Sequence, residues 1–479
     1  MIFNSIIFVG FYAVFFVLYW FVFNKSLKFQ NLLLLAGSYG FYGWWNWHFI
    51  PLLIGYSLFN YLLGFYINKA PQQLVKNILK NAATIIGIGL LFYFKYTNFF
   101  IESFIDLFKK FNIDLDIHTI NIILPLGISF YTFRTLSYIY DIHKGKIQPV
   151  NDWIVFFSFV AFFPSLLSGP IDKAKTLLPQ LSKKREVNYL MAVDGSRQIL
   201  WGAFKKIVIA DNLSPITNNA YDTYHSLPGS TLLVCAFYFS IQLYADFSGY
   251  SDMAIGIAKL LGFEITKNFD YPFFAQNIAE FWRKWHMSLT TWLTDYVFTP
   301  LSIQFRDYDK IGLIMAILIN FTLIGIWHGA NWTFVLFGVL HGCFYIPLIL
   351  KGKLNKKKKP NLNQVWPTGI EFMNMLLTFA LVSFSFILFR SDNLSQAAGI
   401  VKKICSKSII SFPILITWYM IPVISIFLLA EWFQRNAQYT LQIGFIKNNV
   451  IRIGLYYFVL LAIMVFGATG ATQFIYLKF

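Results

Sequence analysis

Long apolar runs are the feature of this sequence that most restricts its fold. The first run, Ser5–Phe23, contains no charged residue, and at about 1.5 Å per residue a helix of this length crosses a hydrocarbon core of roughly 30 Å. Inside a bilayer the backbone must satisfy its own hydrogen bonds, so such runs form α-helices. No basic segment precedes the first run and no small-residue cleavage site follows it, so we expect a retained transmembrane helix rather than a signal peptide.

Comparable runs recur along the chain, and we expect roughly a dozen transmembrane or re-entrant helices, two of them short enough to be re-entrant. The further runs are Phe29–Trp45, Phe49–Ile67, Ile78–Phe100, Ile120–Tyr140, Trp153–Leu167, Leu232–Tyr244, Ile311–Trp327, Trp332–Leu350, Phe372–Phe389, Pro413–Trp432 and Ile453–Gly467. Hydrophobic residues make up 57% of the chain and charged residues 13%, against about 45–50% and about 25% in soluble domains. Soluble-enzyme folds are thereby excluded. We predict an all-α, polytopic membrane protein with a single membrane domain over residues 1–479.

The net charge of +17 has a simple source in a membrane protein, because cytoplasmic loops collect Lys and Arg. A nucleic-acid partner is not indicated, since no basic stretch is interleaved with stacking aromatic residues in a polar context. Cys235, Cys343 and Cys405 lie far apart in apolar stretches, which indicates neither a disulfide framework nor a metal cluster.

Charges near the ends of the runs predict the orientation of the chain. Lys25 and Lys28 follow the first run and Lys69 and Lys76 follow the third, whereas the turn 46–48 has no Lys or Arg. Under the positive-inside rule the N-terminus is therefore outside.

Later loops follow this alternation with two exceptions. The weakly acidic loop 102–118 is expected outside, and the run Lys351–Lys359 is the strongest internal marker. The loop 173–206 is strongly basic although the number of preceding spans predicts that it is outside. We therefore expect Pro164–Pro170 to turn back without crossing, because Pro and Gly break helices and irregular backbone at membrane depth is tolerated only inside protein. The charge of Arg390–Lys407 stays unexplained by the alternation.

Ionisable residues in apolar segments are expensive and usually face a protein interior or a water-filled cavity. Three segments concentrate them: YADFSGYSDMAIG at 244–256, FWRKWHMSLTTWL at 281–293 and GIWHGANWTF at 325–334. These segments hold the candidate site residues Asp246, Asp252, Arg283, Lys284, Trp285, His286, His328 and Asn331.

His328 ends a span that has no other ionisable residue, and it lies between Gly325 and Gly329, where backbone or a ligand can approach closely. Asn331 would share its face if the helix continues. An imidazole with a pKa near neutrality is what a general base requires. A buried histidine bonded to a backbone carbonyl is the structural alternative.

His286 follows Trp282, Arg283, Lys284 and Trp285. This pattern is typical of an anchor in the headgroup zone of a membrane, where Trp, Lys and Arg are enriched. It is equally compatible with a catalytic role.

Other chemistries find little support in the sequence. His341, within LFGVLHG, is more typical of a packing or supporting histidine, and none of the seven histidines has a second histidine four residues away, so a zinc site is not indicated. Asp246 and Asp252 would diverge by about 120° around a helix, which does not indicate a carboxylate pair. No phosphate-binding loop, dinucleotide fingerprint or serine-nucleophile elbow is present.

Several motifs together identify a family. They are the MIFNS start, PLGISFYTF from Pro125, FFPSLLSGPI from Phe162, QLYADFSGYSDMAIG from Gln242, FWRKWHMSLTTWL from Phe281, WHGANWTFVLFGVLHG from Trp327 and the closing FIYLKF. In these motifs and their order, almost along its full length, the sequence resembles the membrane-bound O-acyltransferase family, and within it the bacterial alginate O-acetylation branch.

The resemblance implies that His328 matches the catalytic histidine of the family and His286 its second characteristic polar position. It also implies many helices around a central pore with a funnel on one face. Two departures from the family pattern are the segment Leu301–Lys310 (LSIQFRDYDK) and Arg134, which adds a charge near the implied tunnel.

By the same resemblance we expect an acyltransferase in the bacterial cytoplasmic (inner) membrane. It would move an acyl group, most often acetyl, from a cytoplasmic thioester such as acetyl-CoA towards an extracytoplasmic polysaccharide, with an exported esterase-like partner protein and no metal. His328 would accept the proton of the attacking hydroxyl, and His286, Asn331 or a backbone N–H would stabilise the oxyanion.

Four alternatives stay open. Arg283, Lys284 and Lys205 could meet the phosphates of the donor, although anionic lipid headgroups explain them equally well. The donor could instead be an acidic carrier protein, as in D-alanyl transfer to teichoic acid. The chain could also acylate a lipid, or it could transport a glycan or lipid without making a bond.

Overall fold

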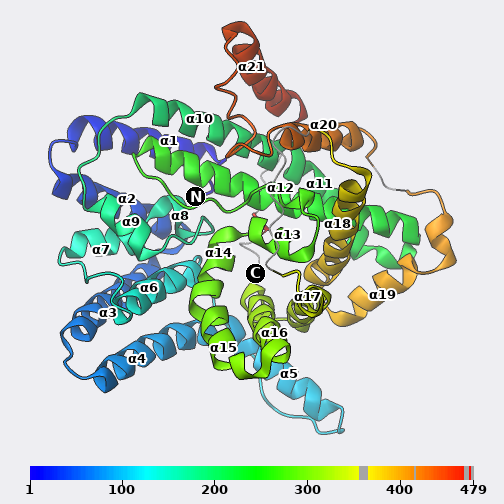
Figure 1. Ribbon diagram of the computed structural model, residues 1–479, viewed down its shortest axis with the longest axis horizontal. Coiled ribbons are helices and arrows are strands. Elements are labelled where there is room, and N and C mark those ends of the chain that lie inside the picture. Colours follow the sequence, from blue (N-terminus) through cyan, green and yellow to red (C-terminus); the bar gives the residue numbers. More distant parts are fainter. Residues whose placement is uncertain (355–364, 415–416, 469–473, 476–479) are drawn as a thin grey trace. The chain divides into compact units, whose positions relative to one another are not determined.

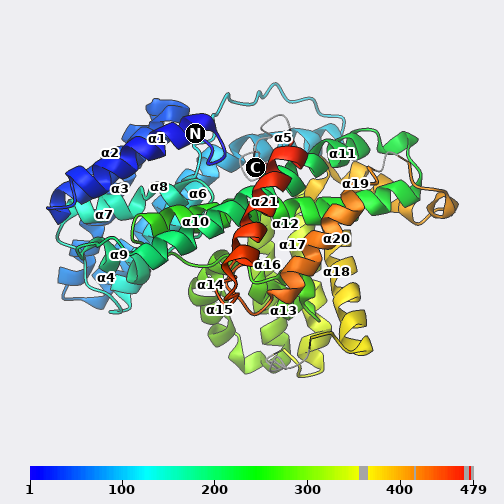
Figure 2. The same cartoon turned by 90° about the horizontal axis from the view of Figure 1, so that it is seen from above.

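The computed structural model describes residues 1–354, 365–414, 417–468 and 474–475, and within these ranges it is helical with no strand (Figure 1, Figure 2). The α-helices are α1 (Ile6–Val17), α2 (Leu27–Asn46), α3 (Ile50–Lys69), α4 (Gln73–Leu91), α5 (Thr97–Lys109), α6 (Ile128–His143), α7 (Trp153–Val160), α8 (Phe163–Leu166), α9 (Ala174–Leu181), α10 (Tyr189–Phe204), α11 (Asp211–Asp222), α12 (Gly229–Leu260), α13 (Ile278–Lys284), α14 (Met287–Leu293), α15 (Thr299–Gln304), α16 (Asp309–His328), α17 (Trp332–Leu350), α18 (Gly369–Arg390), α19 (Leu394–Ile404), α20 (Met420–Phe433) and α21 (Asn449–Phe466). Wider π-helical turns are η1 (Leu18–Val22), η3 (Phe92–Tyr96), η4 (Lys205–Ala210) and η7 (Thr294–Phe298), and short 3-10 turns are η2 (Trp47–Phe49), η5 (Tyr224–Ser226), η6 (Pro272–Phe274), η8 (Arg306–Tyr308) and η9 (Lys407–Ile410). The expected all-α fold class is confirmed.

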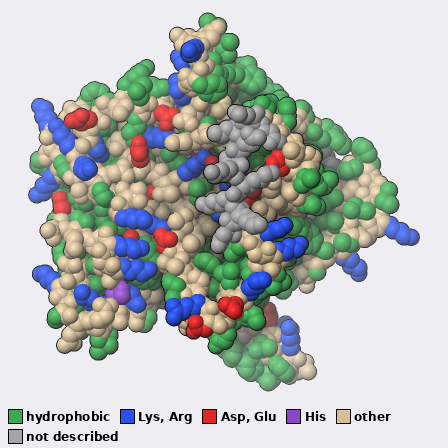
Figure 3. Space-filling view, viewed as in Figure 1, with side chains coloured by type: hydrophobic (Ala, Val, Ile, Leu, Met, Phe, Trp, Pro, Cys, Tyr) green, Lys and Arg blue, Asp and Glu red, His purple; other side chains and the backbone are tan. Residues whose placement is uncertain are grey.

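Seven helical stretches among the described residues are long and apolar enough to cross a membrane: Leu27–Lys69, Gln73–Lys109, Gly229–Leu260, Arg306–His328, Trp332–Leu350, Gly369–Arg390 and Asn449–Phe466. Ile6–Val22 and Met420–Phe433 are shorter apolar helices. Many large apolar side chains are exposed, as lipid contact requires, and Figure 3 shows hydrophobic side chains interspersed with charged ones on one face. The chain is therefore a multi-pass membrane protein.

Two expected spans are wrong in extent. The run Leu232–Tyr244 is only part of α12, which continues as far as Leu260. The run Ile120–Tyr140 becomes helical only at Ile128, because Gly127 has a left-handed backbone (φ 72°) and follows Pro125. A Cβ on Gly127 would lie 2.5 Å from the carbonyl oxygen of Leu166, so this turn requires glycine. The helix is broken around Pro164–Pro170 as expected, since α7 has only 8 residues and α8 only 4, whereas the return of this segment without crossing the membrane stays a prediction.

Arg134 stabilises this broken segment. Its guanidinium donates to the carbonyls of Phe159 (3.0 Å) and Val160 (3.1 Å), where α7 ends, and to Ser165 Oγ (2.6 Å). The last carbonyls of a helix lack partners within the helix, and a cation is favourable there. Arg134 is fully buried, so the charge that departs from the family pattern caps a short helix; the implied tunnel and funnel stay predictions.

The contacts of the chain form two compact units. One comprises Met1–Ser196 with Ala254–Thr266, and the other Arg197–Met253 with Lys267–Phe479, so the boundaries fall inside α10 and α12. The single domain over 1–479 stays a prediction. All the candidate site residues lie in the second unit.

Most of α12 belongs to the second unit, and it is the most enclosed of the long apolar helices, with 83% of its most apolar 18-residue stretch buried. In the second unit, α16 and α17 form a tight hairpin. A Cβ on Gly325 would lie 2.2 Å from the carbonyl oxygen of Phe334, and a Cβ on Gly338 2.3 Å from that of Phe321. Gly325, three residues before His328, therefore allows α16 and α17 to pack closely.

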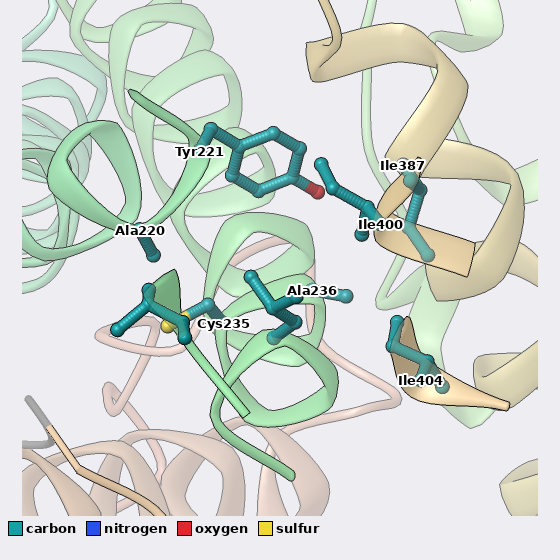
Figure 4. Close-up of a cluster of buried hydrophobic side chains, with 9 residues drawn as sticks. Ala220, Tyr221, Cys235, Ala236, Ile387, Ile400 and Ile404 are labelled. Carbon is teal, nitrogen blue, oxygen red and sulfur yellow. The ribbon is translucent and has the colours of Figure 1, made fainter. Parts of the chain in front are cut away.

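A cluster of buried side chains joins α11, α12, α18 and α19 in the same unit (Figure 4). Its members are Ala220, Tyr221, Leu227, Leu232, Cys235, Ala236, Ile387, Ile400 and Ile404. At its edge the Arg390 guanidinium donates to Asn218 Oδ1 (2.9 Å) and lies 5.2 Å from the Tyr221 ring centroid. Part of the charge in Arg390–Lys407 thus has a local structural use, whereas most of the run Lys351–Lys359 and of the closing FIYLKF lies outside the described residues.

Candidate active site

His328 is the last residue of α16, and its side chain is buried among aromatic rings. The ring centroids of Trp327 and Phe389 lie 4.9 Å and 5.0 Å from that of the imidazole, and those of Phe337 and Phe334 lie 6.0 Å and 6.4 Å away. Close packing of this kind excludes water from most of the imidazole.

Asn331 is expected to share a helical face with His328 only if the helix continues, and the helix does not continue. The helix ends at His328 because Gly329 is extended (φ −172°, ψ 160°). Asn331 caps the next helix: its Oδ1 accepts from the Thr333 N–H (2.9 Å), and its Nδ2 donates to the carbonyl of Asp392 (2.6 Å). Both ends of the amide are therefore engaged in holding α17 and the chain after α18.

His286 is fully buried and has a left-handed backbone (φ 44°, ψ 52°) in the turn between α13 and α14. Its ring centroid lies 4.7 Å from that of Phe247 on α12 and 5.7 Å from that of Trp327 on α16. Complete burial is not the behaviour of an interfacial anchor. Burial also lowers the pKa of His286 to about 3, which keeps the imidazole neutral at physiological pH.

The two histidines therefore meet the same side chain. Trp327 contacts the imidazole of His286 and precedes His328, whose ring it also touches. The structure thus brings together two of the three polar segments, 281–293 and 325–334, and Phe247 adds the third. A left-handed non-glycine residue costs stability and occurs disproportionately at functional sites.

Asp246 and Asp252 are both held in ion pairs. Lys205 Nζ lies 2.5 Å from Asp252 Oδ2, and Lys206 Nζ lies 2.7 Å from Asp246 Oδ1 and 2.8 Å from Asp211 Oδ1. Lys205 and Lys206 are adjacent in the π-helical turn η4 and point in different directions, as the two aspartates on α12 do. Lys205 and Lys206 are nearly inaccessible, so Lys205 is not available at the surface for donor phosphates.

Two further contacts of these residues were not anticipated from the sequence. The backbone N–H of Ile475 donates to Asp246 Oδ2 (2.8 Å), and Gln198 Nε2 donates to Asp252 Oδ1 (2.8 Å). Glu431, buried near the end of α20, accepts from the Tyr244 hydroxyl with both carboxylate oxygens (3.0 and 2.9 Å). A lone acid in the apolar run Pro413–Trp432 was the signal that could have found Glu431.

The remaining candidates of segment 281–293 have contacts of their own. Arg283 is exposed and donates to the Leu354 carbonyl (3.5 Å), while Lys284 pairs with Glu280 one helical turn away (3.0 Å). Trp285 is buried and packs on Phe281, Phe269, Phe273, Tyr244 and Phe386. Trp285 therefore supports the turn before His286. Arg283 is available for anionic groups, whereas half-buried Lys284 already has a carboxylate partner.

His341 has a defined hydrogen-bonding role. Its Nδ1 accepts from the Trp282 indole N–H (3.0 Å), and its Nε2 lies 2.8 Å from Ser385 Oγ, whose own proton goes to the Val382 carbonyl. The hydrogen-bond pattern assigns the Nε2–H tautomer. His341 thus joins α13, α17 and α18 as a supporting residue.

The departure at Leu301–Lys310 forms the end of α15, the turn η8 and the start of α16. Arg306 and Asp307 are exposed there. Within the part of the chain that the structure describes, no group of three or more His, Cys, Asp or Glu residues is arranged to hold a metal ion.

Comparison with known proteins supplies the chemical context for this geometry. The model of MBOAT, the membrane-bound O-acyltransferase family, matches residues 150–350. The chain is 36% identical to the probable alginate O-acetylase AlgI of Azotobacter vinelandii, over 77% of this chain and 71% of that protein. It is 32% identical to the peptidoglycan O-acetyltransferase of Helicobacter pylori, over 79% and 74% of the two chains. With the teichoic acid D-alanyltransferase of Bacillus subtilis it shares 31% identity over 56% of this chain and 69% of that protein.

Proposed function

Because the chain belongs to the membrane-bound O-acyltransferase family, we propose that it transfers acetyl groups from cytoplasmic acetyl-CoA towards a hydroxyl of an extracytoplasmic polysaccharide. As a member of this family it is an acyltransferase that uses an acyl donor. The observation that carries the proposal is that two buried histidines, His286 and His328, contact one tryptophan, Trp327. The chain that holds them is similar to an alginate O-acetylase and to a peptidoglycan O-acetyltransferase.

In the proposed reaction His328 accepts the proton of the attacking hydroxyl. The hydroxyl oxygen forms a bond to the thioester carbonyl carbon, the carbon–sulfur bond breaks, and the departing sulfur takes the proton back from His328. General-base catalysis of this kind contributes about a hundred- to ten-thousand-fold in rate.

His286 stabilises the negative charge that develops on the carbonyl oxygen. A neutral imidazole has one N–H donor, and in a water-excluded site such a donor is worth more than in water. Asn331, the other side chain considered for this role, is engaged as a helix cap. His286 is therefore the better candidate.

The surroundings follow from this reaction. A protein that carries acetyl from the cytoplasm to a surface glycan resides in the cytoplasmic membrane as one membrane domain and delivers to an exported, esterase-like partner. Exposed Arg283 supplies a cation for the phosphates of the donor, and half-buried Lys284, which also pairs with Glu280, supplies a second.

The first test measures ester-linked acetate on cell-surface glycans. Strains carrying wild type, a deletion, His328→Ala, His286→Ala and the control His118→Ala are compared at matched protein levels, since His118 is highly exposed. We expect acetate to be lost in the deletion and in His328→Ala, strongly lowered in His286→Ala and unchanged in His118→Ala. Unchanged acetate in the deletion would contradict the proposal.

A second candidate donor is an aminoacyl-loaded acidic carrier protein, favoured by the identity to the D-alanyltransferase. Purified protein supplied with labelled acetyl-CoA or with charged carrier separates the two donors. A transporter that makes no bond predicts label crossing the membrane without an ester product.

A further inference from the structure

The turn that holds His286 is hydrogen-bonded to residues 268–270, which precede α13 in the chain. The Asp270 N–H donates to the Lys284 carbonyl (3.0 Å), and the Met287 N–H donates to the Asn268 carbonyl (2.8 Å). These bonds lie on either side of His286, so residues 268–270 set the path of the backbone on which the imidazole stands.

The side chain of Asn268 adds the most specific contacts. Its Oδ1 accepts from the Ser288 hydroxyl (2.6 Å) and from the Ser288 N–H (3.3 Å), and its Nδ2 donates to Ser251 Oγ (3.1 Å). Asn268 is fully buried, and Ser251 and Ser288 are nearly so. One amide therefore links the residue two positions after His286 to the middle of α12.

This link has a direct geometric consequence for the imidazole. The ring of His286 packs on Phe247, which lies one helical turn before Ser251 on α12. Asn268 thus holds the turn against the same helix that the ring contacts. The left-handed conformation of His286 is unfavourable for a residue with a Cβ, so it needs such external bonds to persist.

We propose that Asn268 is a positioning residue for His286, which orients the imidazole in the transfer reaction through Ser288 and Ser251. The inference rests on the proposed function of His286 and adds the groups that hold it. Asn268 touches neither imidazole in this arrangement; it acts through the turn.

The first test compares Asn268→Leu, Ser288→Ala, the double variant and the control Asn60→Leu. Leucine has nearly the shape of asparagine without its hydrogen bonds. Asn60 is equally buried and donates to the Tyr56 carbonyl in the other unit. Acetyl transfer from acetyl-CoA is measured in membrane vesicles at matched amounts of folded protein.

We expect Asn268→Leu to lower kcat about ten- to hundred-fold, the scale of misplacing a catalytic group, with KM for the donor nearly unchanged. Ser288→Ala has a smaller effect, and the double variant falls no further than Asn268→Leu because both changes break one linkage. Asn60→Leu keeps its kcat. An additive double variant, or equal losses in Asn268→Leu and Asn60→Leu, overturns the positioning role. If Asn268→Leu does not fold, Ser288→Ala carries the comparison alone.

A second readout does not depend on transfer. In protein labelled with ¹⁵N-histidine, the imidazole signal of His286 is assigned by its loss in His286→Asn. We expect this signal to shift in Asn268→Leu and Ser288→Ala and to stay in place in Asn60→Leu, with His341 unmoved throughout. If the wild type itself transfers no acetyl while the His286 signal shifts in the two variants, the result would contradict the proposed function and support the positioning of His286. An unmoved His286 signal would contradict the positioning itself.

Discussion

At the scale of single residues, His286 carries two costs at once. Its left-handed backbone is worth about 1–3 kcal/mol of strain, and its fully buried imidazole must stay neutral. The hydrogen bonds from residues 268–270 offset the backbone strain. The aromatic rings of Phe247 and Trp327 surround the neutral imidazole.

The lowered pKa of His286 predicts a pH dependence of stability. The pKa is about 3 in the folded state and near 6.5 in the unfolded chain, so between these values the unfolded state binds the extra proton and stability falls as the pH falls. We expect the free energy of unfolding of the wild type to drop by about 2 kcal/mol more than that of His286→Asn between pH 7.5 and pH 5. Unfolding in detergent at both pH values measures this difference. Equal drops in the two proteins would show that the imidazole does not stay neutral on folding.

The buried ion pair of Asp252 and Lys205 predicts a large effect of removing one partner. Asp252→Asn retains an acceptor for Gln198 but leaves the Lys205 ammonium without its carboxylate. We expect a loss of about 3–5 kcal/mol in stability. The matched control is Asp270→Asn, whose pair with Lys267 is much more accessible and is worth at most about 1 kcal/mol. Similar losses of stability in both variants would mean that the buried pair contributes no more to stability than the accessible one.

At the scale of the helices, the packing of α16 against α17 determines the position of His328 at the end of α16. Gly325 and Gly338 let the two helices approach so closely that neither position accommodates a Cβ. The sequence run Trp332–Leu350 coincides with α17, whereas Ile120–Tyr140 begins too early, since apolar character alone does not register the left-handed Gly127.

Gly338→Ala therefore tests the coupling between helix packing and the site. Its methyl group would lie 2.3 Å from the Phe321 carbonyl oxygen, which separates the helices and costs roughly 1–3 kcal/mol. We expect lower stability and lower acetyl transfer, because the end of α16 shifts. Gly454→Ala in α21 is the control: nothing lies within 4 Å of the added Cβ, and the change stabilises by up to about 1 kcal/mol. Full activity in Gly338→Ala would separate the hairpin packing from catalysis.

At the scale of the whole molecule, the alternation of charges predicts the sides of the membrane. Lys69 at the end of α3 is expected inside, and Asp114 in the loop after α5 is expected outside; both are exposed. In a variant without Cys235, Cys343 and Cys405, a membrane-impermeant maleimide should label Asp114→Cys in intact spheroplasts and Lys69→Cys only after permeabilisation. The reverse labelling pattern would show that Lys69 lies outside and Asp114 inside, which contradicts the predicted orientation.

The sequence by itself determined the helical class, the length of most apolar helices, and the burial of His328 at the end of one of them. Each depends on local features: apolar length at about 1.5 Å per residue and the cost of a polar group in lipid. The motif order was likewise sufficient for the family, which the comparisons confirm.

Only the tertiary structure decided the partners of these residues. Asp246 and Asp252 pair with two adjacent lysines about forty residues earlier, Asn331 caps a helix instead of facing the site, and Asn268 holds the turn of His286. These contacts join segments that lie apart in the sequence. Apolar periodicity describes which face of one helix is buried but not which polar group it meets there.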